Sequence, residues 1–249
     1  MKLSVIVLNY NQTQTTLRCL ESLKHSLAEI EDSEILLIDN GSTDKIPLEN
    51  LDDYTNLQYY QLSANIGIAR GRNYGLRKAT GEYILILDND TIVNKEAIES
   101  LLNYIQKSVN TGIVSPVLLN VDDTVQSSFR DYPGIKEKLR NIFLKASPRK
   151  PDFDSDVIHP CYVIGACQMF RKGLVSEIGL LDENIFYGPE DADFCLRASQ
   201  AGYTIDCLTT VTIYHDHRRI TKRHPISKMA FRHFKALLYF YRKHHRWFA

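Results

Sequence analysis

Residues 83–90 read Tyr-Ile-Leu-Ile-Leu-Asp-Asn-Asp, and this stretch decides the fold. Five apolar residues in succession are typical of a strand that is buried on both faces, as in a parallel sheet. Asp88 and Asp90 follow at the carboxyl end of that strand. Two carboxylates this close raise each other's pKa unless a positive charge lies between them. A polar turn also uses Asp and Asn, so the triplet alone leaves open a turn or a divalent cation site.

The first half of the chain alternates between short apolar strands and helices. We expect strands at residues 3–8, 34–39, 57–62 and 83–88, and helices at 13–26, 68–78 and 95–107. This alternation predicts an α/β fold with a mostly parallel central sheet and helices on both faces. In such sheets, ligands bind beyond the carboxyl ends of the strands.

Polar residues follow each of these four strands. Asn9 and Asn11 follow the first strand, Asp39 ends the second, Asn65 lies just after the third, and Asp88 ends the fourth. Solvated loops would explain each of these residues separately. They would not explain why all four strands are followed by acids or amides. Polar groups that converge on one rim indicate a binding site.

The second half of the chain is less regular. Residues 120–158 indicate a mobile loop or an acceptor-side insertion, and residues 159–171 are apolar again. A helix is expected from Pro189 to about residue 200, followed by strands at 203–208 and 211–215. Glu190 and Asp191 lie at the helix start, where the helix dipole favours an ionised carboxylate. His215 ends the last strand.

Composition sets limits on the class of protein. The chain has 249 residues, 44% hydrophobic and 24% charged, with no net charge. Five cysteines without metal-ligand spacing predict reduced thiols in a cytosolic protein. No secretory signal is expected, because the chain opens on a strand, and no apolar run approaches the ~20 residues that a membrane span needs.

The C-terminal segment is strongly basic. Residues 216–249 contain ten Lys and Arg and one acid, a net charge of +9. Residues 226–241 predict an amphipathic helix. Its apolar face would hold Ile226, Met229, Ala230, Phe234, Leu237, Leu238 and Tyr241, and its basic face Lys228, Arg232, Lys235, Arg242 and Arg246. The apolar face either docks on the domain or lies on an anionic membrane. No nucleic-acid partner is predicted, because the basic region does not extend over the body.

In this order, the motifs resemble the family-2 glycosyltransferases, which are inverting enzymes of the GT-A fold. The resemblance covers residues 3–119 and 159–217, and rests on residues 4–11, 37–44, 65–73, 87–90 and 188–197. The Phe-Tyr-Gly-Pro-Glu-Asp stretch at 186–191 looks like the bacterial rhamnosyltransferase-like branch. We therefore expect a GT-A domain at residues 1–217 and a basic amphipathic helix at 218–249, packed on the same domain.

The resemblance implies a role for each matching residue. Asp191 would be the catalytic base, and Asp39 would bind the base or ribose of the nucleotide. Asp90 and His215 would ligate Mn²⁺ or Mg²⁺, with His217 as a competing candidate. Asp88 would contact the ribose or a metal-bound water. The remaining residues expected to contact the nucleotide sugar are Asn9, Asn11, Asn65, Arg70, Asn89 and Glu190.

The implied activity is transfer of a sugar from a nucleotide diphosphate, dTDP-rhamnose or a UDP-sugar, to a hydroxyl group with inversion. The acceptor would be a glycan or a lipid-linked glycan in surface polysaccharide synthesis, in the cytoplasm or on the inner face of the membrane. Two alternatives stay open. A sugar nucleotidyltransferase would be expected to carry a Gly-rich, basic loop after the first strand, where this chain has Asn9-Tyr10-Asn11-Gln12. A non-catalytic carbohydrate-binding subunit would not need Asp191.

Overall fold

The computed structural model describes residues 3–30, 32–130, 155–216 and 228–244. Four parallel strands form one half of the central sheet: β1 (Leu3–Asn9), β2 (Ser33–Asp39), β3 (Leu57–Gln61) and β4 (Tyr83–Asp88). They alternate with α1 (Thr13–Leu27), α2 (Ile68–Lys78) and α3 (Lys95–Lys107), and a short 3-10 helix, η1, spans Leu48–Asn50. The predicted strands and helices of this half are present, with ends that differ by at most one residue.

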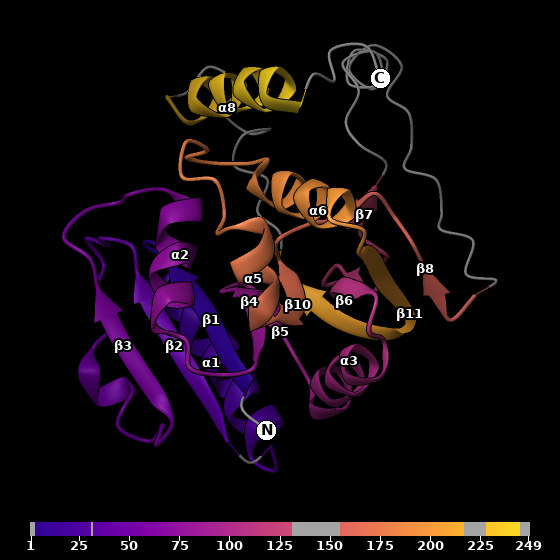
Figure 1. Cartoon of the computed structure of the whole chain (residues 1–249). Helices are drawn as coiled ribbons and strands as arrows, with labels where there is room; N and C mark the ends of the chain where they lie inside the picture. Colours follow the sequence, from indigo (N-terminus) through magenta and orange to yellow (C-terminus); the bar gives the residue numbers. More distant parts are fainter. Residues whose placement is uncertain (1–2, 31, 131–154, 217–227, 245–249) are drawn as a thin grey trace.

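The other half of the sheet was harder to predict. Its strands are β5 (Thr91–Ile92), β6 (Thr111–Leu119), β8 (Val157–Ile158), β10 (Cys167–Arg171) and β11 (Thr204–His215). Among the described residues the strand order is β3-β2-β1-β4-β10-β6-β11-β5, with β8 beside β11 (Figure 1). A separate pair joins β7 (Phe129–Arg130) to β9 (Tyr162–Val163). The predicted strands 203–208 and 211–215 form one strand, β11, whose register against β6 shifts between Leu208 and Thr212.

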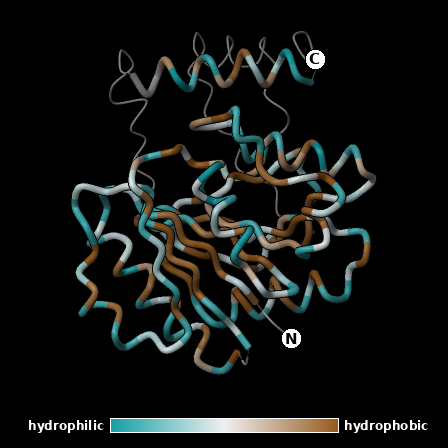
Figure 2. Tube along the Cα trace, turned by 60° about the vertical axis from the view of Figure 1, so that its left-hand side comes forward, coloured by the Kyte–Doolittle hydropathy of each residue, from teal (hydrophilic) through white to brown (hydrophobic). Residues whose placement is uncertain are grey.

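Antiparallel β10 lies between β4 and β6, which connects the two halves of the sheet. Helices cover both faces of the sheet, with α2 in front of β1 and β2 and α1 behind them in Figure 1. The remaining helices are α5 (Lys172–Ile178), α6 (Glu190–Gln200) and α8 (Lys228–His244). The most hydrophobic segments form the central strands (Figure 2), and β4 is buried up to Leu87, as its sequence predicts.

Gly67 connects the rim of the sheet to a later part of the chain. Its φ of +91° is in the region that favours glycine. A Cβ there would lie 2.8 Å from both the ring and the carbonyl oxygen of Phe186. The same carbonyl accepts a hydrogen bond from Ile68 N at 2.9 Å. The start of α2 is therefore held against the segment that leads into α6.

The C-terminal helix α8 confirms the helix expected from the basic tail. It docks through Ala236, Phe240 and Tyr241, which are at most 5% exposed. The predicted apolar face was partly wrong: Phe234 and Leu238 point outward and are 56% and 39% exposed. Of the other predicted positions, Ile226 and Arg246 lie outside the described residues. The boundary between residues 217 and 218 stays a prediction.

The structure also describes the cysteines and the lengths of the helices. All five cysteines are free, and burial raises the pKa of Cys19 to about 12. Within the described ranges, no helix combines the length and the apolar character needed to cross a bilayer.

Candidate active site

Three side chains at the ends of β4 and β11 form a compact group. Asp88, Asp90 and His215 each offer one ligand atom, and these atoms lie within 4.8 Å of one another. His215 Nε2 is 3.2 Å from Asp90 Oδ1 and 4.0 Å from Asp88 Oδ2. The short strand β5 makes this possible, because Thr91 pairs with His215 and Asp216 N donates to Asp90 O. Two carboxylates and one imidazole fit Mn²⁺ well, and Mg²⁺ less well, since Mg²⁺ prefers oxygen ligands.

Gln126 orients the imidazole of His215. Its amide nitrogen donates to His215 O at 2.6 Å and to Asn120 Oδ1 at 2.8 Å. The amide oxygen then accepts from His215 Nδ1 at 2.8 Å, so that Nε2 is directed at the two carboxylates. Burial lowers the pKa of His215, but the hydrogen bond and charge of Asp90 outweigh burial and raise it. Sequence reasoning missed Gln126, because it lies in the irregular segment after residue 120.

A buried guanidinium connects this group to the start of α6. Arg72 is 4% exposed, and its Nη2 contacts Asp88 Oδ1 at 2.6 Å and Gly165 O at 2.8 Å. Its Nη1 contacts Glu190 Oε1 at 3.2 Å. A Cβ on residue 165 would lie 2.4 Å from Nη1, so the close approach requires glycine. Burial works against the charge of Arg72, but Asp88 and Glu190 raise its pKa overall.

Glu190 and Asp191 occupy the first turn of α6. Asp191 accepts hydrogen bonds from Ala192 N at 2.7 Å and Gly165 N at 3.1 Å. The helix start was expected to favour the ionised form, yet burial outweighs these hydrogen bonds and raises the pKa of Asp191. Burial, together with the charge of Asp191, also raises the pKa of Glu190 to about 7. One oxygen of Glu190, Oε2, has no hydrogen-bond partner among the described residues.

Asp39 lies at the end of β2 and is 0% exposed. Its carboxylate accepts from Ser42 N at 2.7 Å, Asn9 Nδ2 at 3.0 Å and Tyr59 OH at 3.4 Å. Asn9 in turn accepts from the Thr16 hydroxyl at 3.0 Å, and this hydroxyl accepts from Asn89 Nδ2 at 2.8 Å. The end of β2 is thus connected through side chains to the Asp-Asn-Asp triplet.

The chain matches the model of glycosyl transferase family 2 over residues 4–179, which is more than half of its length. The chain belongs to this family. The match includes Asp39, Asp88, Asp90 and Arg72, and it ends before Asp191 and His215. The fold expectation is confirmed as well, since the similar solved structures are GT-A glycosyltransferases.

Two relatives of this family-2 glycosyltransferase are rhamnosyltransferases by name. An N-acetylglucosaminyl-diphospho-decaprenol L-rhamnosyltransferase of Mycobacterium tuberculosis is 24% identical, over 98% of this chain and 86% of its own length. The dTDP-rhamnosyl transferase RfbF of Shigella flexneri is also 24% identical, over 79% of this chain and 64% of its own length. A mannosyltransferase of Pyrobaculum calidifontis, solved with GDP-Man and Mn²⁺, superposes with a TM-score of 0.64 at 16% identity. That superposition covers 88% of this chain and 58% of the mannosyltransferase, so it shows the fold alone.

Three residues predicted to contact the sugar nucleotide of the glycosyltransferase make protein contacts in this structure. Asn11, with a φ of +52°, accepts from Thr43 N at 2.8 Å and shapes the loop after β2. Asn65 Oδ1 accepts from Gly67 N at 2.9 Å and from Asn40 at 3.3 Å. Arg70 is exposed, and its Nε is 3.7 Å from Glu183 Oε2. Their ligand roles stay predictions, while His217 lies outside the described residues.

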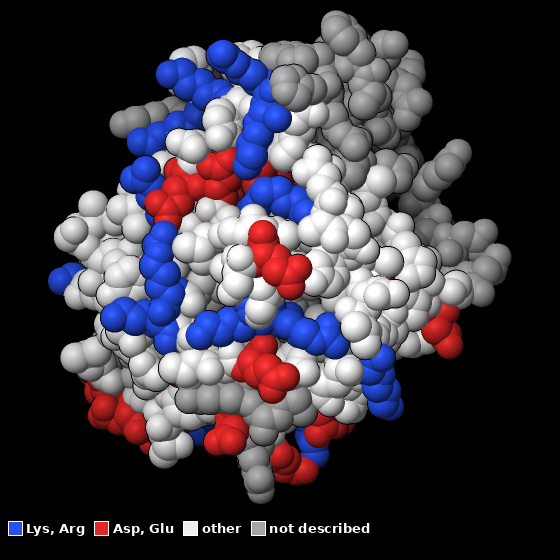
Figure 3. All heavy atoms as spheres, viewed as in Figure 1, with Lys and Arg blue, Asp and Glu red and all other residues white. Residues whose placement is uncertain are grey.

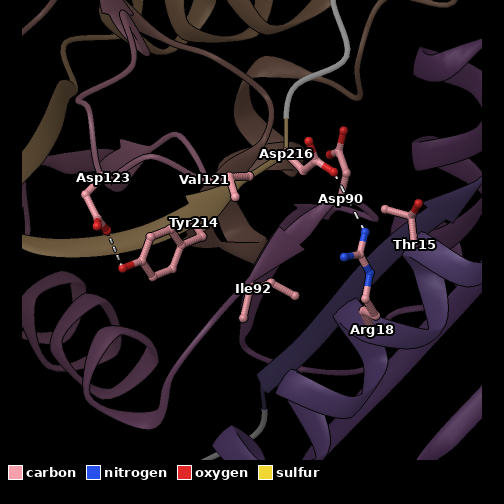
Figure 4. A pocket seen from close by; sticks show the side chains of 8 residues that line it. All are labelled: Thr15, Arg18, Asp90, Ile92, Val121, Asp123, Tyr214 and Asp216. Atoms are coloured by element: carbon pink, nitrogen blue, oxygen red, sulfur yellow. Dashed lines mark hydrogen bonds and ion pairs between the residues drawn. The ribbon is translucent and has the colours of Figure 1, made fainter.

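A cavity of about 310 Å³ opens beside Asp90 (Figure 4). Arg18 crosses it from α1 toward Asp216 at 3.7 Å, and Asp123 contacts the Tyr214 hydroxyl at 2.7 Å. The lining residues are Thr15, Arg18, Asp90, Ile92, Val121, Asp123, Tyr214 and Asp216. The carboxylate of Asp90 is therefore accessible to a ligand from this side.

Replacement of Arg72 should destabilise the enzyme strongly. Arg72→Met leaves the buried Glu190 and the half-buried Asp88 without their counter-charge, which costs about 3–5 kcal/mol. For a chain of this size, the melting temperature should fall by roughly 10 °C. Arg70→Met, on the same helix and exposed, should shift it by no more than about 2 °C. Equal shifts for the two variants in thermal denaturation would contradict a buried charge centre at Arg72.

Proposed function

We propose that the protein is an inverting glycosyltransferase that moves a sugar from a nucleoside diphosphate to the hydroxyl group of an acceptor. One observation carries this proposal: the buried Arg72 contacts both Asp88, of the Asp88–Asp90–His215 group, and Glu190, the chain neighbour of Asp191. The two halves of a displacement reaction need this proximity. One group must take the proton of the attacking hydroxyl while another neutralises the departing diphosphate.

Asp191 is the general base in this proposal. A base must be ionised to accept a proton, but a pKa nearer the working pH makes the transfer easier. Burial raises the pKa of Asp191 in this direction. The N–H groups of Gly165 and Ala192 hold its carboxylate in a fixed orientation.

The group Asp88, Asp90 and His215 would hold a divalent cation, with Mn²⁺ favoured over Mg²⁺ by the imidazole. When bound, such an ion neutralises the negative charge that develops on the leaving diphosphate. Arg72 keeps Asp88 in place, and Gln126 keeps His215 in place. Asp39, which is fully buried, would set the floor of the nucleotide pocket together with Asn9.

For the donor we propose dTDP-rhamnose first and a UDP-sugar second. The support is the name of two relatives, one a dTDP-rhamnosyl transferase and one an L-rhamnosyltransferase. The acceptor of the mycobacterial relative is a lipid-linked sugar, N-acetylglucosaminyl-diphospho-decaprenol. We propose an acceptor of the same kind, a glycan or lipid-linked glycan in surface polysaccharide synthesis.

A thermal-shift screen of dTDP-, UDP- and GDP-sugars, each with and without Mn²⁺, tests the donor proposal. A ligand at a hundredfold excess over its dissociation constant stabilises the native state by about 2.7 kcal/mol. We expect stabilisation by one nucleotide class, and only when Mn²⁺ is present. Release of nucleoside diphosphate that depends on added acceptor then identifies a transferase. Stabilisation by none of these sugars would contradict the proposal.

We also propose that the enzyme works in the cytoplasm at the inner surface of the membrane and contacts it through α8. The outward side of α8 carries Phe231, Phe234 and Leu238, which are 58%, 56% and 39% exposed. Lys235 lies on the same side, 4.8 Å from the ring of Phe231. The sequence of α8 contains no acidic residue, and basic side chains gather over this helix at the top of Figure 3. Aromatic and basic side chains on one face suit an anionic lipid surface.

Replacement of the two outward phenylalanines should weaken membrane binding. Phe231→Ser with Phe234→Ser removes apolar side chains worth about 1.5–3 kcal/mol each when fully buried in lipid, so affinity should fall at least about tenfold. Co-sedimentation with vesicles that contain phosphatidylglycerol measures this loss. Val109→Ser, also at an exposed apolar position (79%), should bind as the wild type does. If the wild type does not bind these vesicles, the proposed membrane contact is wrong. The proposal that the protein transfers a sugar does not depend on this result.

A further inference from the structure

The inward side of α8 contacts the segment that carries the catalytic carboxylate. Residues 182–193 lead from the end of α5 into the first turn of α6. His233 contacts Tyr187 O at 3.3 Å, and the guanidinium of Arg232 lies 4.0 Å from the ring centroid of Phe186. These contacts place α8 against the middle of the segment.

One ammonium group binds both ends of this segment. Lys243 Nζ is 2.7 Å from Asp182 Oδ2 and 2.6 Å from Asp193 Oδ1. Asp193 is 0% exposed and also contacts His244 Nε2 at 2.8 Å. Burial alone would raise the pKa of Asp182, but the hydrogen bond from Lys243 and further hydrogen bonds lower it to about 2. The two acids are eleven positions apart in the chain and are joined here through a single side chain of another helix.

Asp191 lies two positions before Asp193, on the same turn of α6. Its neighbour Glu190 contacts Arg72, and its own carboxylate contacts Gly165 N. A shift of the segment would therefore move the base relative to Asp88 and Asp90. Displacements of about 1 Å in a catalytic group can reduce a rate by roughly a hundredfold.

We propose that Lys243 is a positioning residue, which joins Asp182 to Asp193 and thereby fixes Asp191 against the donor site. This inference rests on the proposed role of Asp191 as the base. It assigns to α8 a function in catalysis that is separate from its outward, lipid-facing side. Because Lys243 does not touch the donor site, its loss should lower kcat and leave donor binding unchanged.

The test compares Lys243→Met with Lys107→Met in the full chain. Lys107 is an exposed lysine in the last turn of α3, and none of the described residues forms an ion pair with it. At a temperature well below both melting points, we expect kcat of Lys243→Met to fall about 10- to 100-fold. KM for the donor and the affinity for the nucleotide should stay within about twofold of the wild type. Lys107→Met should match the wild type, and Lys243→Arg, which can also bind two carboxylates, should recover most of kcat.

A milder variant covers the case in which Lys243→Met does not fold. Asp182→Asn removes one side of the bridge and leaves Asp193 paired with Lys243, His244 and Arg197. We expect a smaller fall in kcat, about three- to tenfold, again with unchanged nucleotide affinity. A folded Lys243→Met or Asp182→Asn with wild-type kcat would overturn the positioning role. A loss of nucleotide affinity in the same variants would also overturn it, since the effect would then lie in the donor site. If the wild type itself transfers no sugar, the proposed function fails instead.

Discussion

Replacement of Asp191 by Asn should reduce sugar transfer about 10²- to 10⁴-fold, the usual contribution of a general base. Asn has nearly the same shape, but its single amide oxygen can accept from only one of the two N–H groups, Ala192 N or Gly165 N, that Asp191 binds with its two oxygens. The variant loses the ability to accept the proton of the attacking hydroxyl. Nucleotide affinity should stay within about twofold, because Asp191 is not part of the group formed by Asp88, Asp90 and His215. Single-turnover kinetics and nucleotide titration measure the two quantities.

The exposed Asp52 provides a matched control for this variant. Asp52→Asn makes the same chemical change far from the rim and should leave transfer unchanged.

The pH dependence of the transfer rate gives a second test of Asp191 as the base. Protonation of Asp191 at low pH should stop it from acting as a base, so the rate should fall as the solution is acidified. Because burial raises the pKa of Asp191, this fall should begin at a higher pH than it would for an ordinary aspartate. Transfer by Asp191→Asn within tenfold of the wild type would require another base.

Replacement of Asp90 by Ala should abolish metal-dependent donor binding. Loss of an outer-shell partner typically costs 10- to 100-fold in metal affinity, so loss of a direct ligand should cost more than a hundredfold. The variant also removes the hydrogen-bond partner of His215 Nε2. Electron paramagnetic resonance of free Mn²⁺ reports metal affinity without any need for activity, and calorimetry with nucleotide reports the donor.

Asp123 is the control for Asp90. It lines the same cavity and binds the Tyr214 hydroxyl, but it is not part of the group formed by Asp88, Asp90 and His215. Asp123→Ala should therefore leave Mn²⁺ affinity within about twofold. If Asp90→Ala binds Mn²⁺ and nucleotide as the wild type does, the metal site is wrongly assigned.

The sequence predicted the rim of the site well because buried parallel strands have a strong local pattern. Residues 83–88 are apolar throughout, and the structure makes them a central strand, β4. Once that strand is known, Asp88 and Asp90 must lie at the edge where ligands bind. His215 could be placed there for the same reason, as the last residue of a strand.

Contacts between distant segments could not be predicted in this way. Antiparallel β10 pairs with β4 and β6, which are distant from it in the chain. The hydrophobic periodicity of a strand does not indicate which other strands it pairs with. The choice between Arg70 and Arg72 depends on which side of α2 faces the sheet. The buried positions Ala69, Arg72 and Leu76 follow helical spacing and would have favoured Arg72 as the site residue.

The side of α8 that faces the domain was also not predicted correctly from the sequence. Periodicity placed Phe234 and Leu238 on the docked face, yet both point outward, while Phe240 is 1% exposed. The docked side also makes charged contacts, since Lys243 and His244 meet the buried Asp193 of α6. An acid at a helix start and a lysine fifty residues later give no local signal of this pairing. The contact of Lys243 with Asp193, which we assign a role in catalysis, therefore could not be predicted from the sequence.

The anomeric configuration of the first product tests the central claim most directly. A single in-line displacement assisted by one base, Asp191, must invert the configuration of the transferred sugar. Once the donor screen has identified a substrate, proton NMR of the product at early times gives this configuration. We predict the anomer opposite to that of the donor. Retention would contradict the account, because it requires a second displacement or attack from the same face as the leaving group.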